Sequence, residues 1–268
     1  MVHKLIHVTD PHLVAPGGRI YGLDPQARLG ACLDHIAGEH GDADLCVISG
    51  DLSDTGHPDS YRALHGLLDG FPLPVRLMTG NHDGRANFRA AFPDAPVDPN
   101  GFVQSTADLG DERLIFLDTL DEGHIQGLLC AERLAWLESE LNAAGDRSVS
   151  LFLHHPPLSV CLPHFEKIML ADPEPLMALL RAHGKIRHLF LGHLHLAASG
   201  TMEGIPFTVG RGTCHQILAT LDDRRATFVD GLPAYNVVLF DDQDLIIHEV
   251  EVPERGPVLH MAKQPTRP

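Results

Sequence analysis

The feature that most constrains this chain is a series of short apolar runs, each followed at once by residues that can bind metal ions. Five runs have this form, and the residues that follow them are Asp10 and His12, Asp51, Asn81 and His82, His154 and His155, and His193 and His195. Sites in open α/β sheets form beyond the carboxyl ends of the strands. If the runs are strands of such a sheet, we expect these side chains to meet in one cleft.

The spacing of apolar residues predicts both strands and helices. Buried strands are predicted at 5–9, 45–49, 75–79, 114–118, 148–154 and 186–191. Helical patterns lie between several of them, at about 24–38, 58–69, 85–91, 131–144 and 173–183. This alternation indicates α/β layering with helices outside a sheet.

After residue 195 the pattern changes. GIPFTVG, HQILAT, YNVVLF and LIIHEVEV read as strands joined by short polar turns, with little helix. They predict a second, more antiparallel sheet. We see no internal repeat and no low-complexity linker, so we expect one domain over 1–252 and a loosely held Pro-rich tail over 253–268.

Charge and cysteine content exclude several classes of partner. The formal net charge of −16 disfavours binding to a nucleic-acid polymer, because the phosphate backbone is repelled. The five cysteines are odd in number and form no CxxC motif, which favours free thiols in a reducing cytoplasm. No apolar stretch reaches about 18 residues and the N-terminus has no signal-peptide pattern, so we expect no membrane partner.

The donor types at the strand ends point to metal chemistry. Oxygen and imidazole donors without thiolates suit Mn, Fe, Co or Zn. Gly50, Gly80 and Gly192 each precede a candidate ligand and would allow tight turns and close approach of the backbone to a ligand. Taken singly, each motif has an ordinary reading as a turn, a cap or a strand edge; their joint occurrence favours a metal centre. Spacing alone leaves open whether His193 and His195 hold one ion together or two ions separately.

As a set, the motifs resemble the signature of the calcineurin-like binuclear metallophosphoesterases, over residues 3–216. The motifs are Asp10-x-His12, Gly50-Asp51-x-x-Asp54, Gly80-Asn81-His82-Asp83, His154 and Gly192-His193-x-His195. HHPPL at 154–158, GTCHQ at 212–216 and RIYGLD at 19–24 are similar to the bacterial class III cyclic nucleotide phosphodiesterases and the glycerophosphodiesterase branch.

The resemblance implies a four-layer αββα sandwich, with two mixed sheets flanked by helices, and a centre of two divalent or transition metal ions. One ion would take Asp10, His12, Asp51 and His195. The other would take Asp51, Asn81, His154 and His193, so that Asp51 bridges the pair. His155 would support or pack rather than bind metal. Relatives of this kind also imply a homo-oligomer.

The activity that the resemblance implies is hydrolysis of small phosphodiesters, cyclic nucleotides or glycerophosphodiesters, by in-line attack of a hydroxide that bridges the ions. His82 would contact the phosphoryl group and protonate the leaving group. Asp54 would either orient His82 or be an ordinary turn residue. The substrate side would hold Asn81, His82, His215 and Tyr21, although His215 also fits a plain strand histidine.

Other readings stay open from the residues alone. The chain could be a phosphomonoesterase or nucleotidase, although its basic residues do not cluster near the motifs. It could also be a non-catalytic metal-binding interaction scaffold. Arg224 and Arg225 read as a solvated turn or a phosphate grip. The loop 158–170 should border the cleft, where His164 and Phe165 could stack against a base or shape a small pocket.

Overall fold

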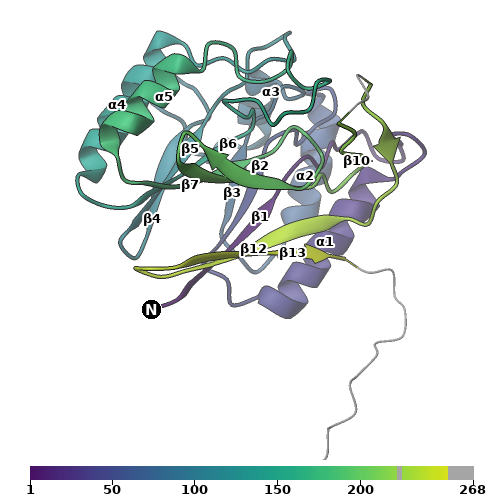
Figure 1. The fold of residues 1–268 in the computed structure, drawn as a ribbon. Helices are drawn as coiled ribbons and strands as arrows, with labels where there is room; N and C mark the ends of the chain where they lie inside the picture. Colours follow the sequence, from purple (N-terminus) through teal and green to yellow (C-terminus); the bar gives the residue numbers. More distant parts are fainter. Residues whose placement is uncertain (222–224, 253–268) are drawn as a thin grey trace, which may run out of the picture.

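Two mixed sheets lie face to face between two layers of helices (Figure 1). The structure is a computed structural model and describes residues 1–221 and 225–252. Arg224 and the tail predicted from residue 253 lie outside the described residues. The predicted four-layer αββα arrangement is confirmed.

The first sheet has the strand order β13-β12-β1-β2-β3. Its strands are β1 (His3–Val8), β2 (Leu45–Ser49), β3 (Val75–Met78), β12 (Ala234–Phe240) and β13 (Leu245–Glu251). Strands β1, β2 and β3 run parallel, whereas β12 pairs antiparallel with β1. The outer face is covered by α1 (Pro25–His40), α2 (Pro58–Leu68) and α3 (Arg85–Ala91).

The second sheet has the order β4-β5-β6-β7-β9-β8. Its strands are β4 (Ser105–Leu109), β5 (Glu112–Leu117), β6 (Val149–Leu153), β7 (Ile186–Leu191), β8 (Ala198–Met202) and β9 (Ile205–Val209). Helices α4 (Ala131–Ala144) and α5 (Glu174–His183) cover its outer face. A short hairpin of β10 (Gln216–Ile217) and β11 (Phe228–Val229) stands apart from both sheets.

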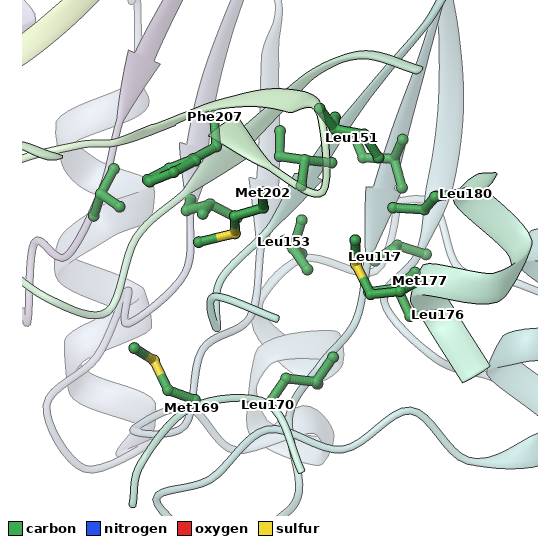
Figure 2. Close-up of a cluster of buried hydrophobic side chains, with 14 of the residues drawn as sticks. Leu117, Leu151, Leu153, Met169, Leu170, Leu176, Met177, Leu180, Met202 and Phe207 are labelled. Atoms are coloured by element: carbon green, nitrogen blue, oxygen red, sulfur yellow. The ribbon is translucent and has the colours of Figure 1, made fainter. Parts of the chain in front are cut away.

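The central strands read as continuous apolar runs because both of their faces are buried. In β2, Cys46 and Ile48 pack under the helices, while Leu45 and Val47 face the second sheet. Figure 2 shows the matching layer beneath α5, where Leu176, Met177 and Leu180 meet leucines of β5 and β6. The packing of each sheet against its helices holds the strands in place, and so positions the residues that follow the strand ends.

All six strands and five helices predicted before residue 195 are confirmed, with shifts of at most a few residues at their ends. The expectation that the strands after residue 195 form a second, more antiparallel sheet is wrong. Strands β8 and β9 extend the second sheet, with β9 parallel to β7, and β12 and β13 extend the first sheet. Apolar periodicity reports which faces are buried, but not which neighbour a strand pairs with.

The short strands account for the remaining differences. HQILAT forms only the two-residue strand β10, and β4, β8 and β11 were not predicted. Within the described residues, no helix combines the length and the apolar character that crossing a bilayer requires.

Candidate metal centre

The candidate ligands come from the carboxyl ends of strands in both sheets. Asp10 and Asp51 follow β1 and β2 of the first sheet, and His154 and His195 follow β6 and β7 of the second. Across the gap between the sheets, His154 Nε2 lies 3.2 Å from Asp51 Oδ2, and His195 Nε2 lies 3.4 Å from Asp10 Oδ1. The fold therefore brings the five predicted strand ends to one place.

The first group of candidate ligands is Asp10, His12, Asp51 and His195. All four are buried, and one ligand atom from each lies within 4.8 Å of the others. His12 Nε2 is 3.4 Å from Asp51 Oδ2 and 3.0 Å from His195 Nε2. These atoms can surround one ion.

The second group is Asp51, Asn81, His154 and His193. The ring centroids of His154 and His193 lie 5.2 Å apart. The Oδ1 atom of Asn81 is buried, and Asn81 and His193 line one cavity, which is described below. His155 also lies within this space. Its Nδ1 accepts from the Thr119 hydroxyl at 2.7 Å, and its Nε2 donates to the Ile125 carbonyl at 3.1 Å. Both ring nitrogens of His155 are therefore used, as a supporting role requires.

Each of the four candidate histidine ligands has one ring nitrogen held by an oxygen. Nδ1 of His12 donates to Asp54 Oδ1 at 3.1 Å, and Nδ1 of His195 donates to the His215 carbonyl at 3.0 Å. Nδ1 of His154 donates to the Ser49 carbonyl at 3.0 Å, and Nε2 of His193 donates to the Ile168 carbonyl at 2.9 Å. In a neutral ring the other nitrogen then carries a lone pair and can bind metal.

Several buried atoms of the two groups have no partner unless a cation is present. Asn81 Oδ1 is buried without a hydrogen bond, and the Asp51 carboxylate at 3.2 Å is the neighbour that His154 Nε2 has. The Nε2 atoms of His12 and His195 face each other at 3.0 Å, although both rings already donate their Nδ1 proton elsewhere. Buried polar atoms are normally satisfied. The donor set therefore fits a centre of divalent ions.

Burial and charge set the protonation states of the candidate ligands. Burial lowers the pKa of His193 to about 3 and that of His195 to about 4, so both are neutral at pH 7, as a ligand must be. Burial opposes ionisation of Asp51, but His154 and His12 hold the pKa of this carboxyl well below its usual range. Burial also works against charge on His154, yet the Asp51 carboxylate outweighs it and raises the pKa of His154 to about 9. Without an ion this ring therefore carries a proton at pH 7, and a bound ion would have to displace it.

The candidate ligands are held in strained backbone conformations. Asp10, His12, Asp51, His193 and His195 have φ angles of +52°, +46°, +48°, +71° and +52°, and they make up five of the nine non-glycine residues with positive φ in the described chain. Such angles cost about 1–3 kcal/mol each and concentrate at functional sites.

The glycines before the ligands act mainly by making room. A Cβ atom on Gly50, whose φ is +107°, would lie 2.5 Å from His154 Nδ1, and one on Gly80 would run into the Asp51 carboxylate. The prediction that these glycines allow close approach is thus confirmed. The left-handed angles of the ligands themselves were not foreseen.

Asp83 ends the GNHD motif, and its role does not follow from the sequence pattern. Its buried carboxylate accepts hydrogen bonds from the backbone amides of Leu52, Ser53 and Gly80 at 3.0, 3.0 and 2.9 Å, and from the Tyr61 hydroxyl at 2.9 Å. Burial, with the nearby Asp51 carboxylate, raises the pKa of Asp83 to about 6. Asp83 therefore ties the loop that carries Asp51 to the loop that carries Asn81. Its place in GNHD, after the candidate ligand Asn81 and the candidate acid His82, was the available signal.

His82 stands at the edge of the centre with its side chain 40% exposed. Its backbone amide donates to Asp51 Oδ1 at 2.9 Å, and its Nδ1 donates to the backbone carbonyl of Asp54 at 2.7 Å. The Asp54 carboxylate is 3.9 Å from that nitrogen. The expected contact between Asp54 and His82 exists, but the main chain makes it, and the side chain of Asp54 holds His12 instead.

A cavity of about 390 Å³ opens beside the two groups. It is lined by His12, Asp51, Asp54, Asn81, His82, His193 and His195, together with Ile20, Tyr21, Ile125, His164, Phe165, Ile168, His215, Ile217, Ala226 and Phe228. The structure thus brings Tyr21 and His215, both predicted on the substrate side, to the same space as the candidate ligands.

The His215 ring stacks on His195 with centroids 4.3 Å apart, and its Nδ1 is buried without a partner. Burial and the neighbouring histidines lower the pKa of His215 to about 3. Phe165 is only 2% exposed and packs in the hydrophobic layer of the second sheet, so it shapes the cavity and offers no free face to a base. Arg225 is not among the residues that line the cavity.

Comparison with known proteins agrees with this geometry. The family model described as calcineurin-like phosphoesterase matches residues 3–197. A probable cyclic nucleotide phosphodiesterase of Rhodopseudomonas palustris is 38% identical over 264 residues, which cover 96% of this chain and 96% of that protein. A cAMP/cGMP dual specificity phosphodiesterase of Mycobacterium tuberculosis is 33% identical and covers 92% of this chain and 79% of its own.

A glycerophosphodiester phosphodiesterase of Enterobacter lignolyticus is 29% identical, over 82% of this chain and 81% of that protein. Among solved structures, a dimetal phosphatase of Danio rerio superposes with a TM-score of 0.70 at 16% identity, over 94% of this chain and 97% of the other. This structural similarity shows a shared fold.

Proposed function

Because this chain belongs to the calcineurin-like phosphoesterase family, we propose that it hydrolyses small phosphodiesters, either cyclic nucleotides or glycerophosphodiesters. The observation that carries the proposal is the arrangement of the four histidines. Each is fixed by an oxygen at one ring nitrogen, and at least three turn the other nitrogen toward two buried carboxylates beside an open cavity.

In this proposal the first group, Asp10, His12, Asp51 and His195, holds one ion. The second group, Asp51, Asn81, His154 and His193, holds the other. Mn, Fe, Co and Zn all suit these donors. Two bound divalent ions would polarise the phosphoryl oxygens and lower the pKa of a water molecule toward neutrality.

His82 is the residue best placed to assist the leaving group. Its Nδ1 is held by the Asp54 carbonyl, so Nε2 is the ring atom left to hydrogen-bond the phosphoryl group or give a proton to the leaving oxygen. The amide of Asn81 and the ring of His215 line the same cavity and would contact the substrate. Asp54 acts through its contacts with His12 and His82.

The charge of the cavity favours diesters over monoesters. Its described lining contains seven residues of the ligand and acid–base set but neither lysine nor arginine. A phosphomonoester carries more negative charge than a diester and gains more from fixed cations. The chain as a whole has a formal net charge of −16, which repels anions. The centre would attract an anionic substrate because the positive charge of the bound ions outweighs the negative charge of Asp10 and Asp51.

We also propose the cytoplasm as its compartment and a homo-oligomer as its assembly. All five cysteines are free thiols, which suits a reducing environment. Sedimentation of the metal-loaded protein tests the assembly.

The test of the function is a rate comparison with Mn(II) supplied. We expect hydrolysis of 3′,5′-cAMP, 2′,3′-cAMP or glycerophosphoethanolamine to exceed that of a phosphomonoester, with two ions bound per chain by metal analysis. A faster monoester reaction supports a nucleotidase instead. Fewer than two ions after repletion, together with no turnover of bis(p-nitrophenyl) phosphate, would leave a non-catalytic scaffold.

A further inference from the structure

Two aromatic rings stand at the mouth of the cavity and remain open to solvent. Tyr21 is 67% exposed and Phe228 is 43% exposed, and both line the cavity. Their rings stack on each other, with centroids 4.8 Å apart and planes 26° apart. Large aromatic side chains usually lose most of their exposure on folding, so a stacked pair left open at a site calls for a ligand.

The backbone holds Tyr21 in place at a cost. Its φ is +50°, in the left-handed region that a tyrosine rarely adopts. It lies in a tight turn closed by Ile20 and Leu23, whose backbone amides and carbonyls exchange hydrogen bonds of 3.0 and 2.8 Å. Phe228 arrives from the distant strand β11, paired with Ile217 of β10. Two separate segments thus converge to build the pair, and one of them is strained to do so.

The pair is connected to the metal centre by a single ring. The His215 ring stacks on the candidate ligand His195 at 4.3 Å, and it lies 5.2 Å from Tyr21 and 5.3 Å from Phe228. In a nucleotide, one sugar separates the phosphorus from the base. A nucleotide with its phosphate at the centre and its sugar beside His215 would therefore bring its base to the Tyr21–Phe228 pair.

We infer that the Tyr21–Phe228 pair stacks against the nucleobase of the substrate and selects nucleotide diesters over diesters with two aliphatic arms. The inference rests on the proposed function and narrows its substrate class. Stacking suits this position because the rings are uncharged and present π faces, which every base can use. A glycerol or ethanolamine arm has no π face and gains little from the pair.

The experiment compares the specificity ratio, kcat/KM for 3′,5′-cAMP over kcat/KM for glycerophosphoethanolamine, in the Mn(II)-loaded protein. We expect Phe228→Ala and Tyr21→Ala each to lower this ratio about ten-fold, mostly through a higher KM for the nucleotide. Phe228→Trp should keep the ratio. The control is Ile246→Ala, which removes a side chain that is 52% exposed on β13 and does not line the cavity.

A binding readout separates stacking from a loss of structure. The chain has one tryptophan, Trp136, so Phe228→Trp in a Trp136→Phe background carries a single reporter. We expect 5′-AMP to quench its fluorescence and glycerol phosphate to leave it unchanged. If the alanine variants fail to fold, Phe228→Leu and this quenching still test the inference.

The outcomes distinguish the two proposals. A metal-loaded wild-type protein that hydrolyses no diester contradicts the proposed function. If the wild-type protein is active but neither substitution changes the specificity ratio, only the stacking role of the Tyr21–Phe228 pair is contradicted. The stacking role is also contradicted if both substitutions convert a dimer to monomers while the specificity ratio is unchanged, because the Tyr21–Phe228 pair would then be a subunit contact.

Discussion

The carboxylate of Asp54 holds His12, not His82. Its Oδ1 lies 3.1 Å from His12 Nδ1, whereas His82 Nδ1 is bound at 2.7 Å by the backbone carbonyl of Asp54. A carboxylate that accepts the second N–H of a ligating histidine fixes the ring and makes it a better donor. In the proposed centre, the side chain of Asp54 would therefore support metal binding and its main chain would orient His82.

This relationship predicts the phenotype of Asp54→Ala. We expect metal affinity at the first group to fall about 10–100-fold, the usual cost of removing such a partner. At saturating Mn(II), kcat should stay within about three-fold of wild type, because the carbonyl that holds His82 is retained. A metal titration of the rate measures both. A large loss of kcat at saturating metal, with unchanged metal affinity, would mean instead that the Asp54 carboxylate acts on His82.

His82→Ala should have the opposite effect. The side chain donates its hydrogen bond to the Asp54 carbonyl and meets the candidate ligands only through a ring contact with His12, so both ions should remain bound, as measured by metal analysis. Loss of a general acid lowers kcat by about 10²–10⁴-fold. Substrates with a good leaving group, such as bis(p-nitrophenyl) phosphate, should lose less than cyclic nucleotides. Wild-type turnover of all substrates would remove His82 from the reaction.

Substitutions of His193 and His195, the two histidines of the GHLH motif, should weaken the binding of different ions. His195→Ala should empty the first group before the second, because His195 Nε2 faces His12 Nε2 and Asp10 Oδ1. His193→Ala should empty the second group first. Spectroscopy of the Co(II)-substituted protein, titrated metal by metal, separates the sites. The assignment is refuted if both variants lose the same single ion.

Asp83→Asn tests the buried carboxylate that joins the two ligand loops. An amide presents N–H groups to at least some of the four donors that now point at Asp83. We expect a loss of about 3 kcal/mol in unfolding free energy, measured by urea denaturation in EDTA. The exposed control Asp94→Asn should change stability by about 0.5 kcal/mol or less. Equal stability of the two variants would mean that the loops are held by other contacts.

A buried histidine between the sheets gives a pH prediction. Burial, with the Arg187 guanidinium, lowers the pKa of His188 from 6.5 to about 4, and its Nε2 lies 3.0 Å from the Thr208 hydroxyl. The unfolded chain takes up a proton near pH 6.5 and the folded chain only near pH 4. The stabilisation is therefore full above about pH 6.5 and is lost as the pH falls toward about 4.

Between about pH 7 and about pH 5 this residue should cost the protein about 2 kcal/mol of stability. His188→Gln should remove that part of the acid sensitivity, whereas the exposed control His248→Gln should keep it. Urea denaturation in EDTA at both pH values measures the difference without interference from metal binding. An unchanged slope in His188→Gln would mean that His188 titrates normally in the fold.

The sequence by itself determined the helices, the central strands and the residue types available for chemistry. Apolar runs such as 45–49 and 186–191 are buried on both faces, so their composition alone marks them as central strands. The glycines before Asp51 and His193 mark turns with no room for a side chain. These signals can be read from short stretches of sequence, because apolar composition and the presence of glycine are properties of the individual residues.

Only the tertiary structure decided the partners. It placed β12 beside β1 and β9 beside β7, gave the Asp54 carboxylate to His12, made Asp83 the tie between two loops, and stacked Tyr21 on Phe228. Each of these choices joins segments that are distant in the chain. Hydrogen bonds and ring contacts depend on distances of a few ångströms, and those distances are set only when both sheets and their helices have packed.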